Sequence, residues 1–145
     1  MPAIFTVDAS VFLNAFNPYE AGHAESRRFL AYLQEQAIPI IVPSLVLPEV
    51  AAAIGRGSGN VELAREFASK LEHLPHLVLV PLDAVLARQA VDVAAVHQLR
   101  GSDAVYIATA LRFGSMLATL DHEQHDRAAA ALKTVYPAEA LTEFG

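Results

Sequence analysis

The sequence contains no cysteine, and this absence limits the kinds of site that the chain can build. Without thiols the protein can have neither a disulfide framework nor a thiolate metal site, so a metal ion would have to bind oxygen or imidazole ligands. The absence of cysteine also agrees with a reducing compartment, and we expect the protein to be cytoplasmic.

Long apolar runs and clusters of basic residues are missing as well. No apolar run approaches the roughly 20 residues that span a bilayer, and the N-terminus lacks the basic stretch of a secretory signal, so we expect a soluble protein with no membrane association. The ten Lys and Arg residues are scattered along a chain with a formal net charge of −6. This balance argues against binding nucleic acid through a broad basic surface, and leaves bound cations or a few well-placed arginines to meet a polyanion.

Apolar residues make up 54% of the 145 residues, which is enough material for one hydrophobic core. With no repeat, linker or low-complexity segment, we expect a single domain over residues 1–145. Apolar patterns predict strands at residues 3–8, 38–42, 77–80 and 116–119, and an edge strand at 134–136. They predict helices at 11–16, 21–36, 44–54, 61–74, 84–98, 103–114 and 122–132, with a glycine-rich exit loop at 55–60. Strands that alternate with such helices indicate an α/β fold: a central parallel sheet of four to five strands with helices on both faces.

Four carboxylates interrupt apolar stretches, where an isolated charge is costly unless something positive meets it. They are Asp8 after the first strand, Glu49 in an otherwise apolar and therefore buried helix, Asp103 at a helix start and Asp121 after the fourth strand. Each has a simpler interpretation. The aspartates could be helix caps, and Glu49 could face solvent, where the helix dipole favours it.

Taken together, the four acids favour a metal site. Two of them follow strands and two begin helices, and a parallel sheet gathers such ends, with its ligands, at one edge. Crowded carboxylates would repel one another unless a hard cation joined them, and oxygen ligands suit Mg²⁺ or Mn²⁺. Such cations activate water and stabilise the leaving oxygen in phosphodiester hydrolysis.

The same positions resemble a known family. Val-Asp-Ala-Ser at 7–10, Pro-Glu-Val at 48–50, Ser-Asp-Ala-Val-Tyr-Ile-Ala at 102–108 and Ala-Thr-Leu-Asp at 118–121 resemble, in this order, the four acidic motifs of PIN-domain ribonucleases. Length and layout resemble the VapC-type toxins of type II toxin–antitoxin systems. The resemblance implies a Mg²⁺- or Mn²⁺-dependent endoribonuclease that leaves 3′-hydroxyl and 5′-phosphate ends on its RNA substrate. It also implies a protein that is often a homodimer and is held inactive by a small antitoxin whose tail occupies the site groove.

By position, the resemblance implies that all four acids bind the metal and carry catalysis, namely Asp8, Glu49, Asp103 and Asp121. Asp8 and Asp103 would be the firmest ligands. Arginines that lie near these acids or near the ends of their helices could steer the phosphate backbone of RNA, and these are Arg56, Arg100 and Arg127.

Two hydroxyls and one amide stand near the acids in the sequence. Ser10 and Thr119 match the hydroxyls that support the site in the resembling family, although each could equally be a local cap. The family often has an aromatic residue or leucine three residues past its last acid, and here that position is Gln124. The segment after Asp121 is therefore less well defined by the resemblance than the rest.

Other functions stay open on the sequence alone. A catalytically inactive PIN-like module that binds RNA, metal or a partner protein would keep the same fold, but the four intact acids count against it. His122, His125 and Asp126 beside Asp121 could serve a His-Asp metal phosphohydrolase, although that class is all-helical. The glycines between residues 55 and 59 follow a helix, whereas a phosphate-binding loop needs a strand before it.

Overall fold

Five short apolar strands form one parallel sheet in the computed structural model, which describes residues 3–145. In chain order they are β1 (Phe5–Val7), β2 (Ile40–Pro43), β3 (Leu77–Val80), β4 (Met116–Ala118) and β5 (Thr134–Val135). Their order across the sheet is β3-β2-β1-β4-β5, with β1 in the middle, and each neighbouring pair is parallel. The predicted α/β class and the parallel sheet, including its edge strand, are confirmed.

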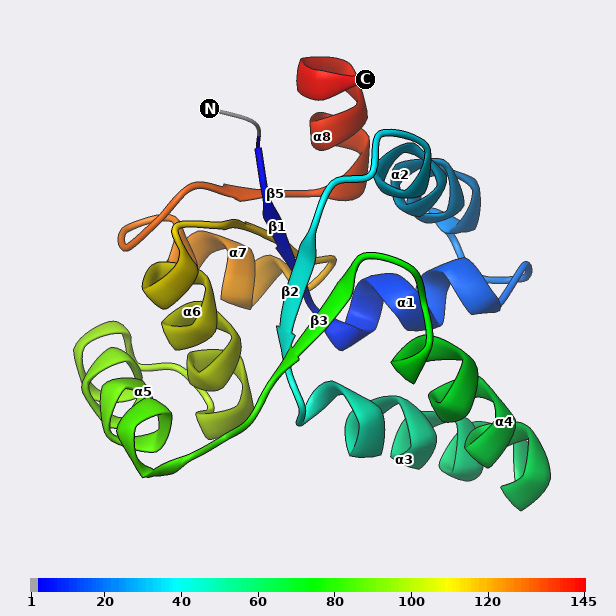
Figure 1. Ribbon diagram of the computed structural model, residues 1–145, viewed down its shortest axis with the longest axis horizontal. Helices are drawn as coiled ribbons and strands as arrows, with labels where there is room; N and C mark the ends of the chain where they lie inside the picture. Colours follow the sequence, from blue (N-terminus) through cyan, green and yellow to red (C-terminus); the bar gives the residue numbers. More distant parts are fainter. Residues whose placement is uncertain (1–2) are drawn as a thin grey trace.

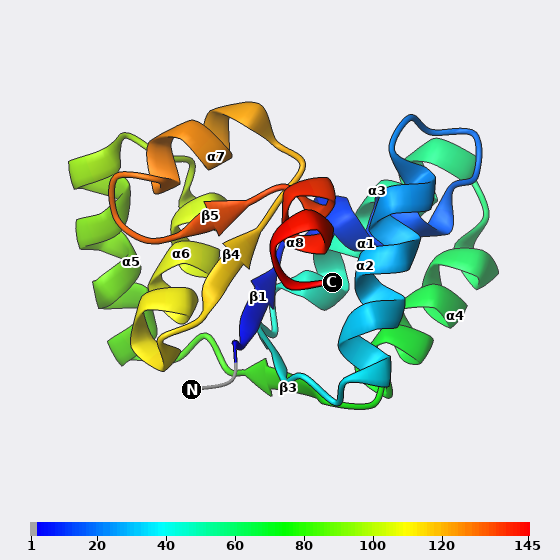
Figure 2. The ribbon, with the colours of Figure 1, turned by 90° about the horizontal axis from the view of Figure 1, so that it is seen from above.

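Between and after these strands, residues 3–145 form eight helices. They are α1 (Ala9–Phe16), α2 (His23–Glu35), α3 (Val46–Ser58), α4 (Val61–Glu72), α5 (Ala84–His97), α6 (Gly101–Phe113), α7 (His122–Ala128) and α8 (Pro137–Phe144). Figures 1 and 2 show α5 and α6 on one side of the sheet and α1, α2 and α4 on the other, so both faces are covered as predicted. Among the described helices, none is long and apolar enough to cross a membrane.

Alternate residues of the strands pack into two apolar clusters. On β2, Ile40 and Val42 join the larger cluster around Phe29, while Ile41 joins a smaller cluster with Val105 on the side of α5 and α6. This period of two follows from the pleat of a strand. Because both faces of the sheet are covered, β1 and β2 are buried along their whole length, which explains their continuous apolar sequences.

The helix that carries Glu49 is not buried on every side, and the prediction that it would be is wrong. α3 buries one face, formed by Val46, Val50 and Ile54. Pro48 and Ala52 lie on the opposite face and are exposed. The helix contains few polar residues because alanine and proline occupy its exposed positions, so composition alone could not reveal its solvent-facing side.

The predicted exit loop at residues 55–60 is also wrong, because α3 continues to Ser58. The Ser58 hydroxyl donates to the carbonyl oxygen of Ile54 at 2.6 Å, and Gly59 ends the helix with a φ of 67°. A glycine at the C-terminal end of a helix adopts this left-handed conformation without steric cost. Gly55 and Gly57 are therefore helical residues in a last turn that lies on the surface.

The last 25 residues depart most from the prediction. The helix predicted at 122–132 ends at Ala128, and α8 was not predicted. α8 begins at Pro137, and the backbone N–H of Tyr136 donates to Glu139 Oε1 at 2.8 Å in a capping box. At its far end, Phe144 meets the core residue Phe5 edge-on, with ring centroids 5.9 Å apart.

Candidate functional site

The carboxyl edge of the sheet brings together elements that are far apart in sequence. β1 and β4 are neighbours, so Asp8 and Asp121 leave the sheet at the same edge. α3 follows β2 at this edge and carries Glu49 in its first turn. α6 leads back to the start of β4, so its first turn, with Asp103, also lies here. Ligands of open parallel sheets collect at this edge.

Asp8 is the most buried of the four acids, with 7% of its surface exposed. Its Oδ2 accepts hydrogen bonds from the hydroxyls of Thr119 at 2.7 Å and Ser10 at 3.0 Å. Burial raises the pKa of Asp8, and these two hydroxyls oppose that rise. Asp8 occupies the N-cap position of α1, but its side chain makes no capping hydrogen bond. The backbone N–H groups of Ser10 and Ala9 lower the pKa of Asp8 less than the two hydroxyls do, so capping alone does not account for this carboxylate.

Glu49 is held by a residue to which the sequence analysis assigns no role. Its Oε1 accepts a 2.5 Å hydrogen bond from the hydroxyl of Tyr106, which is fully buried in α6. Burial raises the pKa of Glu49, the bond from Tyr106 opposes the rise, and the negative charge of Asp8 adds to it. Tyr106 follows Asp103 by three residues, so that spacing could have placed both side chains on one face of α6.

The negative charges of all three other acids raise the pKa of Asp103. Its pKa is raised to about 6, first by burial and then by the negative charges of Asp8, Asp121 and Glu49, while the guanidinium of Arg100 opposes the rise. Asp8, Glu49 and Asp121 therefore lie near enough to Asp103 for their charges to disfavour its ionised form.

Asp121 does act as a helix cap. Its Oδ1 accepts a hydrogen bond from the backbone N–H of Gln124 at 3.1 Å, at the start of α7. The simpler interpretation from the sequence thus applies to this residue, in addition to its negative charge beside Asp103.

The four acids do not form a closed cage. Across residues 3–145, no three acidic or histidine side chains gather closely enough to hold a metal ion in the arrangement shown. Because the Coulomb interaction acts over several ångströms, carboxylates can raise one another's pKa without touching. The donor set itself, oxygen ligands whose pKa values are raised by burial and by one another, fits a hard divalent cation that would relieve this repulsion.

The three arginines considered above differ in position. Arg100 immediately precedes α6 and counteracts the raised pKa of Asp103. Arg127 donates to the carbonyl oxygen of Gln98 and lies 2.8 Å from Glu123, so its guanidinium is already engaged. Arg56 is exposed near the end of α3, about two helical turns from Glu49. Of the three, Arg100 is coupled to the acids.

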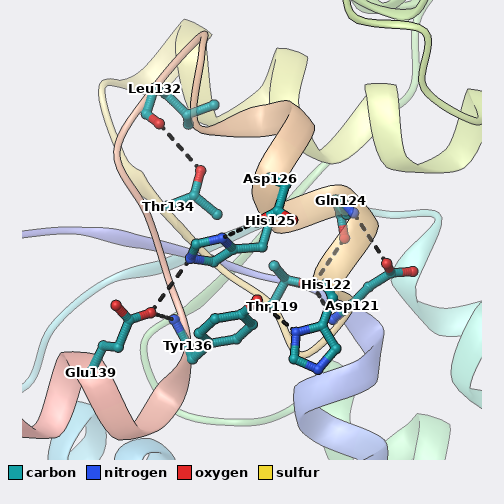
Figure 3. A network of polar contacts seen from close by, with 10 residues as sticks. All are labelled: Thr119, Asp121, His122, Gln124, His125, Asp126, Leu132, Thr134, Tyr136 and Glu139. Carbon is teal, nitrogen blue, oxygen red and sulfur yellow. Dashed lines mark hydrogen bonds and ion pairs between the residues drawn. The ribbon is translucent and has the colours of Figure 1, made fainter.

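The histidines of α7 face the C-terminal segment, as Figure 3 shows. The ring of His125 stacks on Tyr136, with centroids 4.0 Å apart and planes at 4°, and its Nε2 lies 3.4 Å from Glu139. The Nδ1 of His122 is 2.8 Å from the hydroxyl of Tyr136. These rings hold α7 against the segment between β5 and α8, and they do not converge with Asp121 as a His-Asp metal centre would require.

Comparisons with known proteins agree with this architecture. The fold resembles that of the sarcin-ricin loop cleaving toxin VapC20 of Mycobacterium tuberculosis, with 22% sequence identity, a TM-score of 0.73, and coverage of 92% of this chain and 99% of that chain. It also resembles VapBC2 of Rickettsia felis bound to a promoter DNA fragment, with 15% identity, a TM-score of 0.67, and coverage of 92% of this chain and 98% of that chain. A toxin–antitoxin complex of Klebsiella pneumoniae is similar as well, with 19% identity, a TM-score of 0.64, and coverage of 94% of this chain and 98% of that chain. No curated protein sequence matches the chain. Residues 5–130 match the family model described as PIN domain, and the chain therefore belongs to the PIN domain family.

Proposed function

We propose that this protein is an endoribonuclease that depends on Mg²⁺ or Mn²⁺ and acts as the toxin of a toxin–antitoxin pair. Membership of the PIN family and likeness to a toxin described as cleaving the sarcin-ricin loop support a nuclease role. The observation that carries the proposal is that β1, β4, α3 and α6 place four acids at the carboxyl edge of the sheet, where the charges of the other three raise the pKa of Asp103. Like charges at this density are costly unless a cation neutralises them.

In this proposal, the four acids Asp8, Glu49, Asp103 and Asp121 hold the cation. When bound, such an ion supplies the positive charge that activates water and stabilises the leaving oxygen of a phosphodiester. The chain's own groups orient the acids: the hydroxyls of Ser10 and Thr119 hold Asp8, and that of Tyr106 holds Glu49. The guanidinium of Arg100 is the cationic group best able to attract an RNA phosphate here.

The test is cleavage of RNA by the purified protein with Mn²⁺, compared with Asp8→Asn. The substitution keeps the shape of the side chain and removes its charge, and we expect a loss of rate of about 100-fold or more, the scale of a lost electrostatic contribution to catalysis. Asp92→Asn, which changes an exposed acid on α5, is the matched control and should cleave like the wild type.

A second candidate is a binding module of the same fold that holds RNA, metal or a partner protein without cleaving RNA. The observation that favours it is that, among the residues described, no three acidic or histidine side chains enclose an ion as the structure stands. Equal inertness of the wild type and Asp8→Asn towards RNA, with Mn²⁺ present, would support this candidate over the nuclease.

The partners that we propose are a small antitoxin and a second copy of this chain. The structural neighbours include a toxin–antitoxin complex, which supports the first. An apolar groove of about 500 Å³ between α1, α2 and α4 is a surface that an apolar antitoxin segment would fit, and its lining includes Phe12, Phe16, Leu30, Phe67 and Leu71. The test is a search for a small reading frame beside the gene and its co-expression with this chain: the proposal expects such a frame, with a product that co-purifies and suppresses RNA cleavage.

A further inference from the structure

The side chain of Gln124 is buried beside the candidate site and is only partly paired. Gln124 lies on α7 with 1% of its surface exposed, and its amide oxygen is 2.9 Å from the hydroxyl of Thr119. Its amide nitrogen Nε2 is buried and has no hydrogen-bond partner. An unpaired buried N–H is costly, so the orientation of this amide needs an explanation.

In this orientation of the amide, the hydroxyl of Thr119 has more acceptors around it than it has protons to donate. The Thr119 Oγ1 lies 2.7 Å from Asp8 Oδ2, 2.9 Å from Gln124 Oε1 and 3.1 Å from the backbone nitrogen of Asp121. A threonine hydroxyl has one proton to donate and two lone pairs to accept with. An ionised carboxylate and an amide oxygen both only accept, so one proton cannot serve both contacts. One pair of oxygens would face each other without a proton between them.

Rotating the terminal amide of Gln124 by about 180° exchanges its oxygen and nitrogen, which are nearly equal in size, and removes both problems. Nε2 then donates to one lone pair of Thr119, and the backbone N–H of Asp121 donates to the other. The hydroxyl proton of Thr119 is left to donate to Asp8. The amide oxygen takes the buried position without a partner, which proteins tolerate more readily than an unpaired N–H.

We infer that Gln124 donates a hydrogen bond from Nε2 to Thr119 and thereby commits the only hydroxyl proton of Thr119 to the carboxylate of Asp8. Gln124 is then a positioning residue for the candidate site: it acts through Thr119 and fixes the orientation of Asp8. Leucine or phenylalanine at this position would have no such donor. The role of Asp8 in holding a cation rests on the proposed function, whereas the direction of these hydrogen bonds does not.

The first test is the orientation of the amide in the protein without added metal. In ¹⁵N-labelled protein at mildly alkaline pH, an Nε2 proton of Gln124 should show a nuclear Overhauser contact with the side chain of Thr119 and slow exchange with solvent. The protection of that proton should be lost in Thr119→Val, which keeps the shape of the residue but cannot accept. Gln124 amide protons that show no contact with Thr119 would overturn the inference.

The second test is the affinity for Mn²⁺, measured by calorimetry without RNA. Gln124→Met has similar length and no donor, and should weaken binding about 5- to 10-fold, less than the roughly 10- to 100-fold typical of groups that contact a metal ligand directly, because Gln124 acts through Thr119. Thr119→Val should weaken it about 10- to 100-fold. In a Thr119→Val background, Gln124→Met should have no further effect, because its route to Asp8 is already broken.

The matched control is Gln34→Met on α2, where the amide donates to the carbonyl oxygen of Pro75 at 2.8 Å, remote from the acids. It should leave the Mn²⁺ affinity unchanged, and both methionine variants should retain cooperative unfolding. An unchanged affinity in Gln124→Met, or losses that simply add in the double variant, would overturn the inference. A wild type that binds no Mn²⁺ would instead overturn the proposed function, and the amide orientation would still decide whether Gln124 donates to Thr119.

Discussion

Burial gives the acids of the candidate site their shared chemical character. The pKa values of Asp8, Glu49 and Asp103 are all raised, and in each case burial is the largest cause. Hydroxyl donors oppose the rise at Asp8 and Glu49 but do not cancel it. A carboxylate with this balance is stabilised by a positive partner, which can be a proton at acidic pH or a hard cation.

The hydroxyl of Tyr106 allows the opposing effects of burial and hydrogen bonding on the pKa of Glu49 to be tested. In Tyr106→Phe, Glu49 loses the hydrogen bond that lowers its pKa, so the pKa of Glu49 should rise further. The acid limb of the pH profile for RNA cleavage should then move to higher pH, and the rate should fall about 10-fold or more. Tyr32→Phe removes a comparable hydroxyl, which donates to the carbonyl oxygen of Phe144, and should leave the profile in place. A profile that stays fixed in Tyr106→Phe would show that this hydroxyl does not tune Glu49.

The acids could be found in the sequence because each one interrupts an apolar stretch. Their partners were harder to find, because the contacts join distant positions: Tyr106 and Glu49 are 57 residues apart, and Thr119 and Asp8 are 111 apart. Thr119 was identified only through resemblance to a family. The amide of Gln124 was noticed as a departure from that family, but its contact with Thr119 depends on how α7 packs onto the sheet.

At the scale of elements, the sequence predicts best where one face of a helix or a whole strand is buried. The strands β2, β3 and β4 lie within one or two residues of their predicted ranges, because each is a short apolar run between turns. The sequence pattern does not reveal α8, because the helix has only eight residues and its first residue, Pro137, can mark the end of a helix as well as the start of one. α3 extends past its predicted end because helix packing and the cap at Gly59 outweigh the low helix propensity of Gly55 and Gly57.

The packing of α8 predicts a measurable contribution to stability. The ring of Phe144 packs edge-on against Phe5 and lies on the larger core cluster, although residues 131–145 fall outside the segment that matches the PIN family model. Phe144→Ala should lower the free energy of unfolding by about 2 kcal/mol, less than for a fully buried ring, and the melting temperature by roughly 4–8 °C. Phe113→Ala, at an exposed position with 40% of its surface accessible, should have a smaller effect. Equal effects of the two substitutions would mean that α8 is not part of the cooperative core.

At the scale of the whole molecule, the raised pKa values link the stability of the fold to pH. Asp103 has a pKa of about 6 in the folded protein against an ordinary value of 3.8 for an aspartate, so between these values the folded state binds more protons than the unfolded state. Stability should therefore rise as pH falls through 6 and should be lower at neutral pH. Asp8 and Glu49 shift in the same direction and add to this trend.

Melting temperatures measured without metal should show this trend and its reversal by a cation. Between about pH 7.5 and pH 5 the wild type should gain roughly 2–4 °C from Asp103, which corresponds to about 1 kcal/mol after allowance for solvent screening. Asp103→Asn should melt higher than the wild type at neutral pH and gain less on acidification, while Asp92→Asn, an exposed acid on α5, should follow the wild type. At neutral pH, Mn²⁺ at a hundredfold excess over its Kd should stabilise the wild type by about 2.7 kcal/mol, and it should stabilise Asp103→Asn less at the same concentration. A protein that is most stable at neutral pH without metal and does not respond to Mn²⁺ would mean that the four acids are not under the mutual repulsion on which the proposed cation site depends.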